Sequence, residues 1–333
     1  MSWQTPGEAA FLSVSRKAMK DEFEVVFSRL DFPQGTEAAM DALDEVERLE
    51  KVLSVFRFDS RVKYINLAAH EDPVKLDREL FDLIAMCLEM AEATGGAVDI
   101  TCGPFWRIWG FARRENRIPS ELEIESARDV VGYRLVELDP EAKTIRFKKQ
   151  GVELNFGCVG KGFALDVGAR KLREQELDRF LFRGGLSSFL AEGKDWMIGV
   201  AHPMRHGQRL AELTLDGEAV GTSGSDKQFF RYNGHRYSHL IDPRTGRPAE
   251  GVLSVTVLAP NGTLAELLST AFFVLGPEKT EAYCTEHPEI AVLMTLPISR
   301  RAGFEVRHWG FQEVGQEKST HADRLRFVAD DFA

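Results

Sequence analysis

Residues 155–166 (NFGCVGKGFALD) have a composition that could serve phosphate chemistry. A predicted strand leads into closely spaced glycines and then into a predicted helix, with Lys161 among the glycines. Glycine lets backbone groups approach a ligand closely, and a helix N-terminus favours phosphate. The spacing matches neither GxxxxGK[ST] nor GxGxxG. By itself the segment favours a tight turn with a solvated lysine over a phosphate site.

Residues 237–248 (YSHLIDPRTGRP) place His239 directly before a compact turn. Asp-Pro and Thr-Gly pairs fix the backbone of such a turn. A neutral imidazole can accept a proton from a hydroxyl nucleophile at physiological pH. The pattern fits a catalytic base and a structural turn with His239 bonded to backbone equally well.

Residues 265–272 (AELLSTAF) could bind a hard cation. On a helix, Glu266 and Thr270 lie one turn apart on one face, with Ser269 beside them. Carboxylate and hydroxyl oxygens suit Mg²⁺ that is also held by phosphate. The alternative is that these residues only stabilise the helix, since Glu is favourable near a helix start and Thr often hydrogen-bonds to the helix backbone.

Strands and helices are both expected around these side chains, and they do not alternate strictly. This pattern predicts an α+β fold, and we expect one domain with two lobes. The aromatic residues Trp106, Trp109 and Phe111 could face a flat ligand, but such clusters are more often core. Beyond Arg300 the chain is polar, and we expect it to be irregular. The predicted strands are 13–29, 97–101, 180–182, 196–200, 210–215 and 252–259, with shorter ones within 133–155. The predicted helices are 36–56, 77–94 and 264–275, with a further helix after the glycines of 157–175. Residues 112–128 are a predicted surface connection.

Composition narrows the class of protein. The 333 residues carry a formal net charge of -10 and no long basic run, which argues against nucleic acid as a partner. The four cysteines are scattered, without zinc-like spacing. No secretory signal, lipoprotein anchor or membrane segment is recognisable, so we expect a cytoplasmic protein.

Taken together and in order, these segments resemble the ApbE family, the FAD:protein FMN transferases, from about Met19 to Gly276. The resemblance implies a two-lobed α+β fold with mixed or antiparallel sheets, flanking helices and a ligand cleft between the lobes. The segments that carry it are LSVFRFDS (53–60) with Ile65-Asn66, TGGAVDITCGP (94–104) with WGF (109–111), the glycine loop 157–166, Gly184-Gly185, SHLIDPRTG (238–246), and Glu266 with Thr270.

The resemblance implies an enzyme that uses FAD as substrate and Mg²⁺ as cofactor. The FMN half of FAD passes to a Thr or Ser of an acceptor flavoprotein, and AMP leaves. His239 matches the position of the proposed base. The implied metal ligands are the carbonyl of Cys158 and the side chains of Glu266, Ser269 and Thr270. The implied FAD-lining residues are Met19, Phe56, Ala97, Val98, Asp99, Asn155, Lys161 and Leu240.

Three positions depart from the family pattern. Glu266 stands where the family usually has a metal-binding Asp, and Asn155 replaces the Asp that usually opens the glycine loop. Leu186-Ser187-Ser188 follows Gly184-Gly185 where an Asp is usual. These departures leave two alternatives open, an FAD pyrophosphatase that releases FMN and AMP and a non-catalytic FAD-binding protein. We expect the family domain to span residues 13–300, followed by an extension of unknown role at 301–333.

Overall fold

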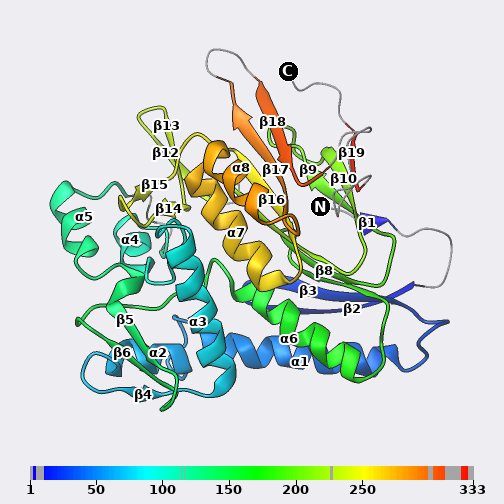
Figure 1. The fold of residues 1–333 in the computed structure, drawn as a ribbon, viewed down its shortest axis with the longest axis horizontal. Coiled ribbons are helices and arrows are strands. Elements are labelled where there is room, and N and C mark those ends of the chain that lie inside the picture. Colours follow the sequence, from blue (N-terminus) through cyan, green and yellow to red (C-terminus); the bar gives the residue numbers. More distant parts are fainter. Residues whose placement is uncertain are drawn as a thin grey trace. The chain divides into compact units, whose positions relative to one another are not determined.

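The computed structural model describes residues 3–4, 11–113, 115, 117–225, 228–298, 303–311 and 324–328. The chain forms two compact units. Unit 1 comprises residues 1–50, 159–224 and 251–333, and unit 2 comprises residues 51–158 and 225–250. The predicted α+β class is confirmed, because helices accompany sheets whose strand pairs are antiparallel throughout the described residues (Figure 1).

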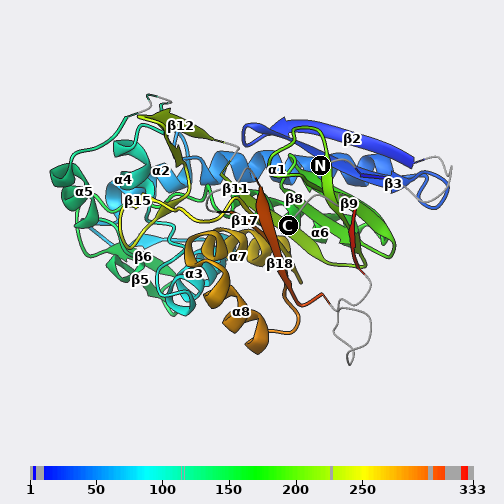
Figure 2. The same ribbon diagram turned by 90° about the horizontal axis from the view of Figure 1, so that it is seen from above.

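Unit 1 is built on a sheet that has eight strands in the described part of the chain, in the order β18-β17-β16-β11-β8-β7-β3-β2. The hairpin β2–β3 forms one edge, and α1 runs alongside it (Figure 2). The strands are β2 Phe11–Ala18, β3 Asp21–Ser28, β7 Phe180–Gly184, β8 Ser188–Glu192, β11 Ala219–Gly224, β16 Ser254–Ala259, β17 Ala291–Pro297 and β18 Phe304–Trp309. The helices are α1 Gly35–Leu53, whose last residues fall in unit 2, α6 Gly160–Glu174, α7 Gly262–Leu275 and α8 Pro277–Glu286.

A second sheet of unit 1 has the order β1-β9-β10-β19, formed by Trp3–Gln4, Trp196–Ala201, Arg209–Leu215 and Leu325–Phe327. Side chains of both sheets, among them Phe189, Ile198 and Val220, form one buried hydrophobic cluster. Because side chains alternate along a strand, the neighbour of Val220, Gly221, faces the other way, toward the backbone of Ala265 on α7. The large sheet therefore has the second sheet on one face and α7 on the other.

Two glycines let α6 and α7 approach within backbone contact. A Cβ added to Gly162 would lie 2.1 Å from the carbonyl oxygen of Gly262, and one added to Gly262 would lie 2.6 Å from that of Gly162. Asp166 of α6 accepts hydrogen bonds from the amides of Gly262 (2.7 Å) and Thr263 (2.8 Å). The first turn of α7 is thus held against α6, which fixes the position of the side chains that follow on α7.

Unit 2 contains shorter elements around a separate aromatic cluster. Its sheet has the order β4-β6-β5, and two small hairpins, β12–β13 and β14–β15, follow later in the chain. The elements are α2 Arg61–Ala68, β4 Val74–Lys75, α3 Arg78–Ala93, α4 Gly103–Ile108, α5 Glu121–Arg128, the 3₁₀ turn Tyr133–Leu135, β5 Val136–Asp139, β6 Thr144–Phe147, β12 Phe229–Tyr232, β13 His235–Ser238, β14 Ile241–Asp242 and β15 Arg247–Pro248. The cluster includes Trp109 and Phe111, with Trp106 packed against it, so the core interpretation of these aromatic residues is confirmed.

Several elements differ from the prediction. The single strand expected at 13–29 is a hairpin, turned by Met19 (φ 53°) and Lys20 (φ 65°). Neither residue is typical of such a turn, so the sequence shows no break there. Residues 97–101 form turns rather than a strand, and the connection at 112–128 contains α5.

The region beyond Arg300 was expected to be irregular, and this was wrong for two segments. Residues 304–309 form β18, which pairs along its length with β17, and residues 325–327 pair with β10. Both strands belong to unit 1. The predicted domain boundary near residue 300 stays a prediction. Within the described residues, no helix has both the length and the apolar character that a membrane span requires.

Candidate functional site

Glu266 lies on α7 in unit 1 and is only 8% exposed. Its Oε2 accepts the amide hydrogen of Gly162 (2.8 Å), and its Oε1 accepts the hydroxyl hydrogen of Ser188 (2.5 Å). Burial of a polar group is costly unless it forms hydrogen bonds, and these two donors supply them. The carboxylate is therefore held in one orientation by the first turn of α6 and by strand β8.

The two hydroxyls expected beside Glu266 are also brought together. Ser269 Oγ lies 2.9 Å and Thr270 Oγ1 lies 3.4 Å from the hydroxyl of Ser223 on β11. Ser269 in addition donates to the carbonyl of Glu266 (3.0 Å), the back-bonding expected of a helical hydroxyl. Sequence reasoning missed Ser223. The run of small residues Gly221-Thr-Ser-Gly224 is the only signal that marks its strand for close packing against a helix.

Lys161 lies in the first turn of α6. Its Nζ donates to the hydroxyl of Ser187 (2.5 Å) and lies 3.6 Å from a carboxylate oxygen of Asp21. Asp21 begins β3 directly after the turn that contains Met19. The structure thus places Met19 and Lys161 near the same end of the hairpin.

In unit 2, the segment Ala97-Val98-Asp99 is buried and tightly fixed. Asp99 accepts hydrogen bonds from the amide and hydroxyl of Thr101 (both 2.7 Å) and from the amide of Tyr133 (2.6 Å). Burial raises the pKa of the Asp99 carboxyl above its usual value, and these hydrogen bonds act in the opposite direction. Asp99 therefore stabilises the local backbone in addition to being a candidate ligand contact.

Asn155 fixes the start of the glycine loop. Its backbone amide donates to the carbonyl of Ile100 (2.7 Å), and its side-chain oxygen accepts the backbone amide hydrogen of Gly157 (2.9 Å). An Asp at this position could accept the same bond, so the departure from the family pattern preserves the turn and removes only the charge. Cys158, whose carbonyl is a predicted metal ligand, follows directly.

His239 directly follows the hairpin β12–β13, whose last residue is Ser238. Its backbone amide donates to the carbonyl of Gln228 (3.0 Å), and its ring Nδ1 lies 3.0 Å from the same oxygen. A carbonyl oxygen can only accept, so this contact requires the proton on Nδ1 and places the basic lone pair on Nε2. The backbone bond and the role of a base are therefore compatible. Leu240 follows in the loop before β14, while Phe56, in another part of unit 2, is 58% exposed.

Other residues of the recognised segments have structural roles. Trp109 Nε1 donates to the carbonyl of Gly246 (2.8 Å), which joins two segments far apart in sequence. The side chain of Asn66 forms both hydrogen bonds of the Leu154 backbone, at 3.0 and 2.8 Å. The side chains of Trp109 and Asn66 therefore stabilise the fold of unit 2 by bonding to its backbone.

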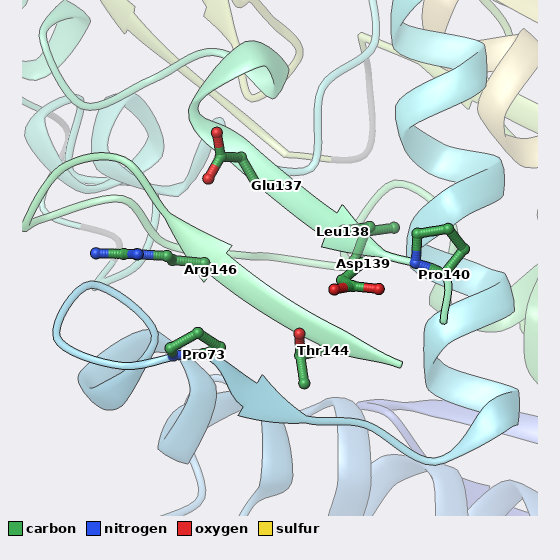
Figure 3. Close-up of a pocket in the computed structure, with 7 residues that line it drawn as sticks. All are labelled: Pro73, Glu137, Leu138, Asp139, Pro140, Thr144 and Arg146. Carbon is green, nitrogen blue, oxygen red and sulfur yellow. The ribbon is translucent and has the colours of Figure 1, made fainter. Parts of the chain in front are cut away.

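No group of three His, Cys, Asp or Glu side chains within the described ranges could hold a metal ion. Among the described residues, a cation bound at Glu266 would therefore need hydroxyl, carbonyl or ligand oxygens to complete its coordination. A pocket in unit 2 lies on β5 and β6, and none of the predicted site residues lines it (Figure 3). Its lining is Pro73, Glu137, Leu138, Asp139, Pro140, Thr144 and Arg146.

Comparison with known proteins agrees with the arrangement of these segments. The model of the ApbE family matches residues 19–294. The chain belongs to the ApbE family. The FAD:protein FMN transferase of Treponema pallidum is 33% identical over an alignment of 282 residues that covers 78% of each chain. The FAD:protein FMN transferase of Escherichia coli K12 is 31% identical over an alignment of 242 residues that covers 70% of this chain and 69% of that protein.

Solved ApbE structures share the fold. The ApbE protein of Thermotoga maritima superposes with a TM-score of 0.79 at 31% identity, covering 86% of this chain and 94% of that one. The flavin transferase ApbE of Vibrio cholerae gives a TM-score of 0.80 at 25% identity, covering 90% and 97%. The predicted family and α+β fold are thus confirmed.

Proposed function

We propose that this chain is an FAD:protein FMN transferase that uses a divalent cation and transfers FMN to a Thr or Ser hydroxyl of an acceptor flavoprotein, releasing AMP. Family membership across residues 19–294 is the observation that carries the proposal. The buried carboxylate of Glu266, with the hydroxyls of Ser269 and Thr270 on the same helix, supports the chemistry.

The residues present fit Mg²⁺. Its preferred ligands are oxygens, and it commonly takes one or two carboxylates together with phosphate oxygens of the substrate. Glu266, Ser269, Thr270 and the carbonyl of Cys158 would hold the cation in this proposal. When bound, it would neutralise charge on the pyrophosphate as a Lewis acid.

His239 is the proposed base. The acceptor hydroxyl oxygen forms a bond to the phosphorus of the FMN half, and the bond from that phosphorus to the bridging oxygen of AMP breaks. AMP leaves with the bonding electron pair. The hydroxyl proton goes to Nε2 of His239, the nitrogen that the contact of Nδ1 with Gln228 leaves basic.

The FAD-lining role of Met19, Phe56, Ala97, Val98, Asp99, Asn155, Lys161 and Leu240 is part of the same proposal. Lys161 offers a cation for a phosphate at the start of α6, where helix amides also favour negative charge. Asp99 and Asn155 would present fixed oxygens and a rigid loop to the nucleotide, because their side chains are already bonded to backbone.

The decisive experiment is incubation with FAD and Mg²⁺, with and without a purified acceptor flavoprotein domain. Transfer predicts AMP release that depends on the acceptor and an acceptor mass increased by one FMN. Free FMN and AMP without acceptor would instead indicate a pyrophosphatase. Tight FAD binding with no AMP at any Mg²⁺ concentration would indicate a non-catalytic FAD-binding protein.

A further inference from the structure

The hydroxyl of Ser188 is placed by rigid elements. Ser188 begins β8 and is 1% exposed. It pairs with Gly184 of β7 on one side and with Gly221 of β11 on the other. A serine between two paired strands has little freedom of its backbone, so its hydroxyl offers Glu266 a donor at a fixed position.

Glu266 uses both of its oxygens. One accepts from Ser188 and the other from the amide of Gly162, the third residue of α6. Amides in the first turn of a helix have no partner within the helix, and the N-cap residue, Val159, makes no side-chain hydrogen bond to them. Glu266 therefore caps α6 from a neighbouring helix. Each carboxylate oxygen keeps a second lone pair that can ligate a cation.

These contacts connect two departures from the family pattern. According to the resemblance, an Asp is usual at position 266, where Glu266 is one methylene longer, and another is usual in the segment after Gly184-Gly185 that contains Ser188. A longer carboxylate has one more rotatable bond and would sample more positions unless it is held. The hydroxyl of Ser188 lies where it holds that carboxylate (2.5 Å).

We propose that Ser188 is a positioning residue that orients Glu266 for cation binding and compensates for the longer side chain. This inference rests on the metal site of the proposed function. Groups that hydrogen-bond to a ligating carboxylate typically contribute 10–100-fold to metal affinity. Because an Asp at position 266 would be one methylene shorter, Ser188 should matter only when Glu is present.

The test is a double-mutant cycle in which the Mn²⁺ dissociation constant of each variant is measured by electron paramagnetic resonance in the absence of FAD. Ser188→Ala should raise the Mn²⁺ dissociation constant about tenfold in the wild-type background. In the Glu266→Asp background, Ser188→Ala should change it less than about twofold, since coupling appears only between groups in contact. Equal weakening in both backgrounds, or none in either, overturns the inference.

Two controls separate the possible failures. Ser254→Ala removes a hydroxyl that bonds to Thr295 in the same sheet, and it should leave Mn²⁺ binding unchanged. Glu266→Ala should abolish the Mn²⁺ site. If it binds Mn²⁺ as the wild type does, or if the wild type binds none, the proposed metal site fails and the inference with it. If Glu266→Ala loses binding and Ser188→Ala keeps it, only the inference fails. Melting temperatures show that each variant is folded.

Discussion

At the residue scale, the candidate chemical groups are held by partners that lie far away in the sequence. Gln228 sets the tautomer of His239, and Ser188 sets the orientation of Glu266. Ser223 contacts the hydroxyls of Ser269 and Thr270 on α7. Each partner is a neutral side chain or a backbone carbonyl. Neutral partners position a group without changing the net charge of the site.

Replacement of His239 by Ala should slow AMP release about 10²- to 10⁴-fold, the usual contribution of a general base. FAD affinity should stay near the wild-type value, because the proposal assigns the ring to the acceptor hydroxyl. The measurement is AMP release under saturating FAD and acceptor, together with FAD titration. His235→Ala, at the exposed first residue of β13, is the matched control. A His239→Ala variant with the wild-type rate would remove this residue from the mechanism.

At the element scale, the contact between α6 and α7 determines where Glu266 lies. The glycines at the crossing allow backbone contact, and Asp166 binds the first turn of α7. The first turn of helix α6 contains Lys161 and Gly162, and α7 carries Glu266, Ser269 and Thr270. A change at the crossing should therefore affect stability and metal binding together.

Gly162→Ala should lower the free energy of unfolding by about 3 kcal/mol, the upper part of the usual range for overpacking, because its Cβ would overlap the carbonyl of Gly262. Urea denaturation measures the change. Gly103→Ala serves as the control, since a Cβ there would meet its nearest neighbour at an ordinary 3.5 Å. Similar unfolding midpoints for Gly162→Ala and the wild type would show that α6 and α7 do not need this close approach.

Asp166→Asn should reveal a pH dependence of stability. Burial raises the pKa of Asp166 above its usual value of 3.8, and the charge of Glu266 adds to this, while bonds from Thr263 and Gly262 oppose it. The folded state therefore binds this proton more tightly than the unfolded state does. The contribution of the group to stability is complete below about pH 3.8 and decreases as pH rises through the raised pKa.

The free-energy difference between wild type and Asp166→Asn should accordingly be larger near pH 4 than at pH 7. The Asn side chain has only one oxygen that can accept hydrogen bonds from α7. The variant should therefore be less stable than the wild type at both pH values, by about 1–3 kcal/mol in addition to the effect of the titration. Denaturation at several pH values measures both effects. A difference that increased with pH would contradict the assigned direction of the pKa shift.

At the scale of the whole molecule, the predicted residues are divided between the two units. Met19, Lys161, Glu266, Ser269 and Thr270 belong to unit 1, whereas the others belong to unit 2. Neither unit contains the complete set. The family match at 19–294 begins and ends in unit 1 and includes all of unit 2, so the family pattern requires both.

FAD with Mg²⁺ should therefore protect segments of both units from hydrogen exchange. We expect slower exchange at 160–162 in unit 1 and at 97–101 in unit 2, and an increase in stability of about 2.7 kcal/mol at a ligand concentration 100 times its dissociation constant. Exchange followed by mass spectrometry, with a chelator as the control, tests this. Protection confined to one unit would show that the assigned FAD-lining residues of the other unit are wrong.

The sequence by itself determined the family, the α+β class and the longer helices α1, α3, α6 and α7 with some of the strands, because hydrophobic periodicity, caps and glycine spacing act locally. It predicted helices at 36–56, 77–94 and 264–275, and the structure has them at 35–53, 78–93 and 262–275. It missed the turn at Met19-Lys20, since these residue types do not mark one. It also missed β18, an edge strand of the described sheet with alternating apolar and polar residues that forms by pairing with β17.

Only the tertiary structure decided how the candidate groups are held. Whether His239 was a base or a backbone-bonded residue stayed open in the sequence, and the contact with Gln228 shows that the two are compatible. The pairing of Glu266 with Ser188 joins residues 78 positions apart and depends on the packing of α7 against β8 and α6. Hydrogen bonds of this kind arise from packing between distant segments, and no local pattern encodes them.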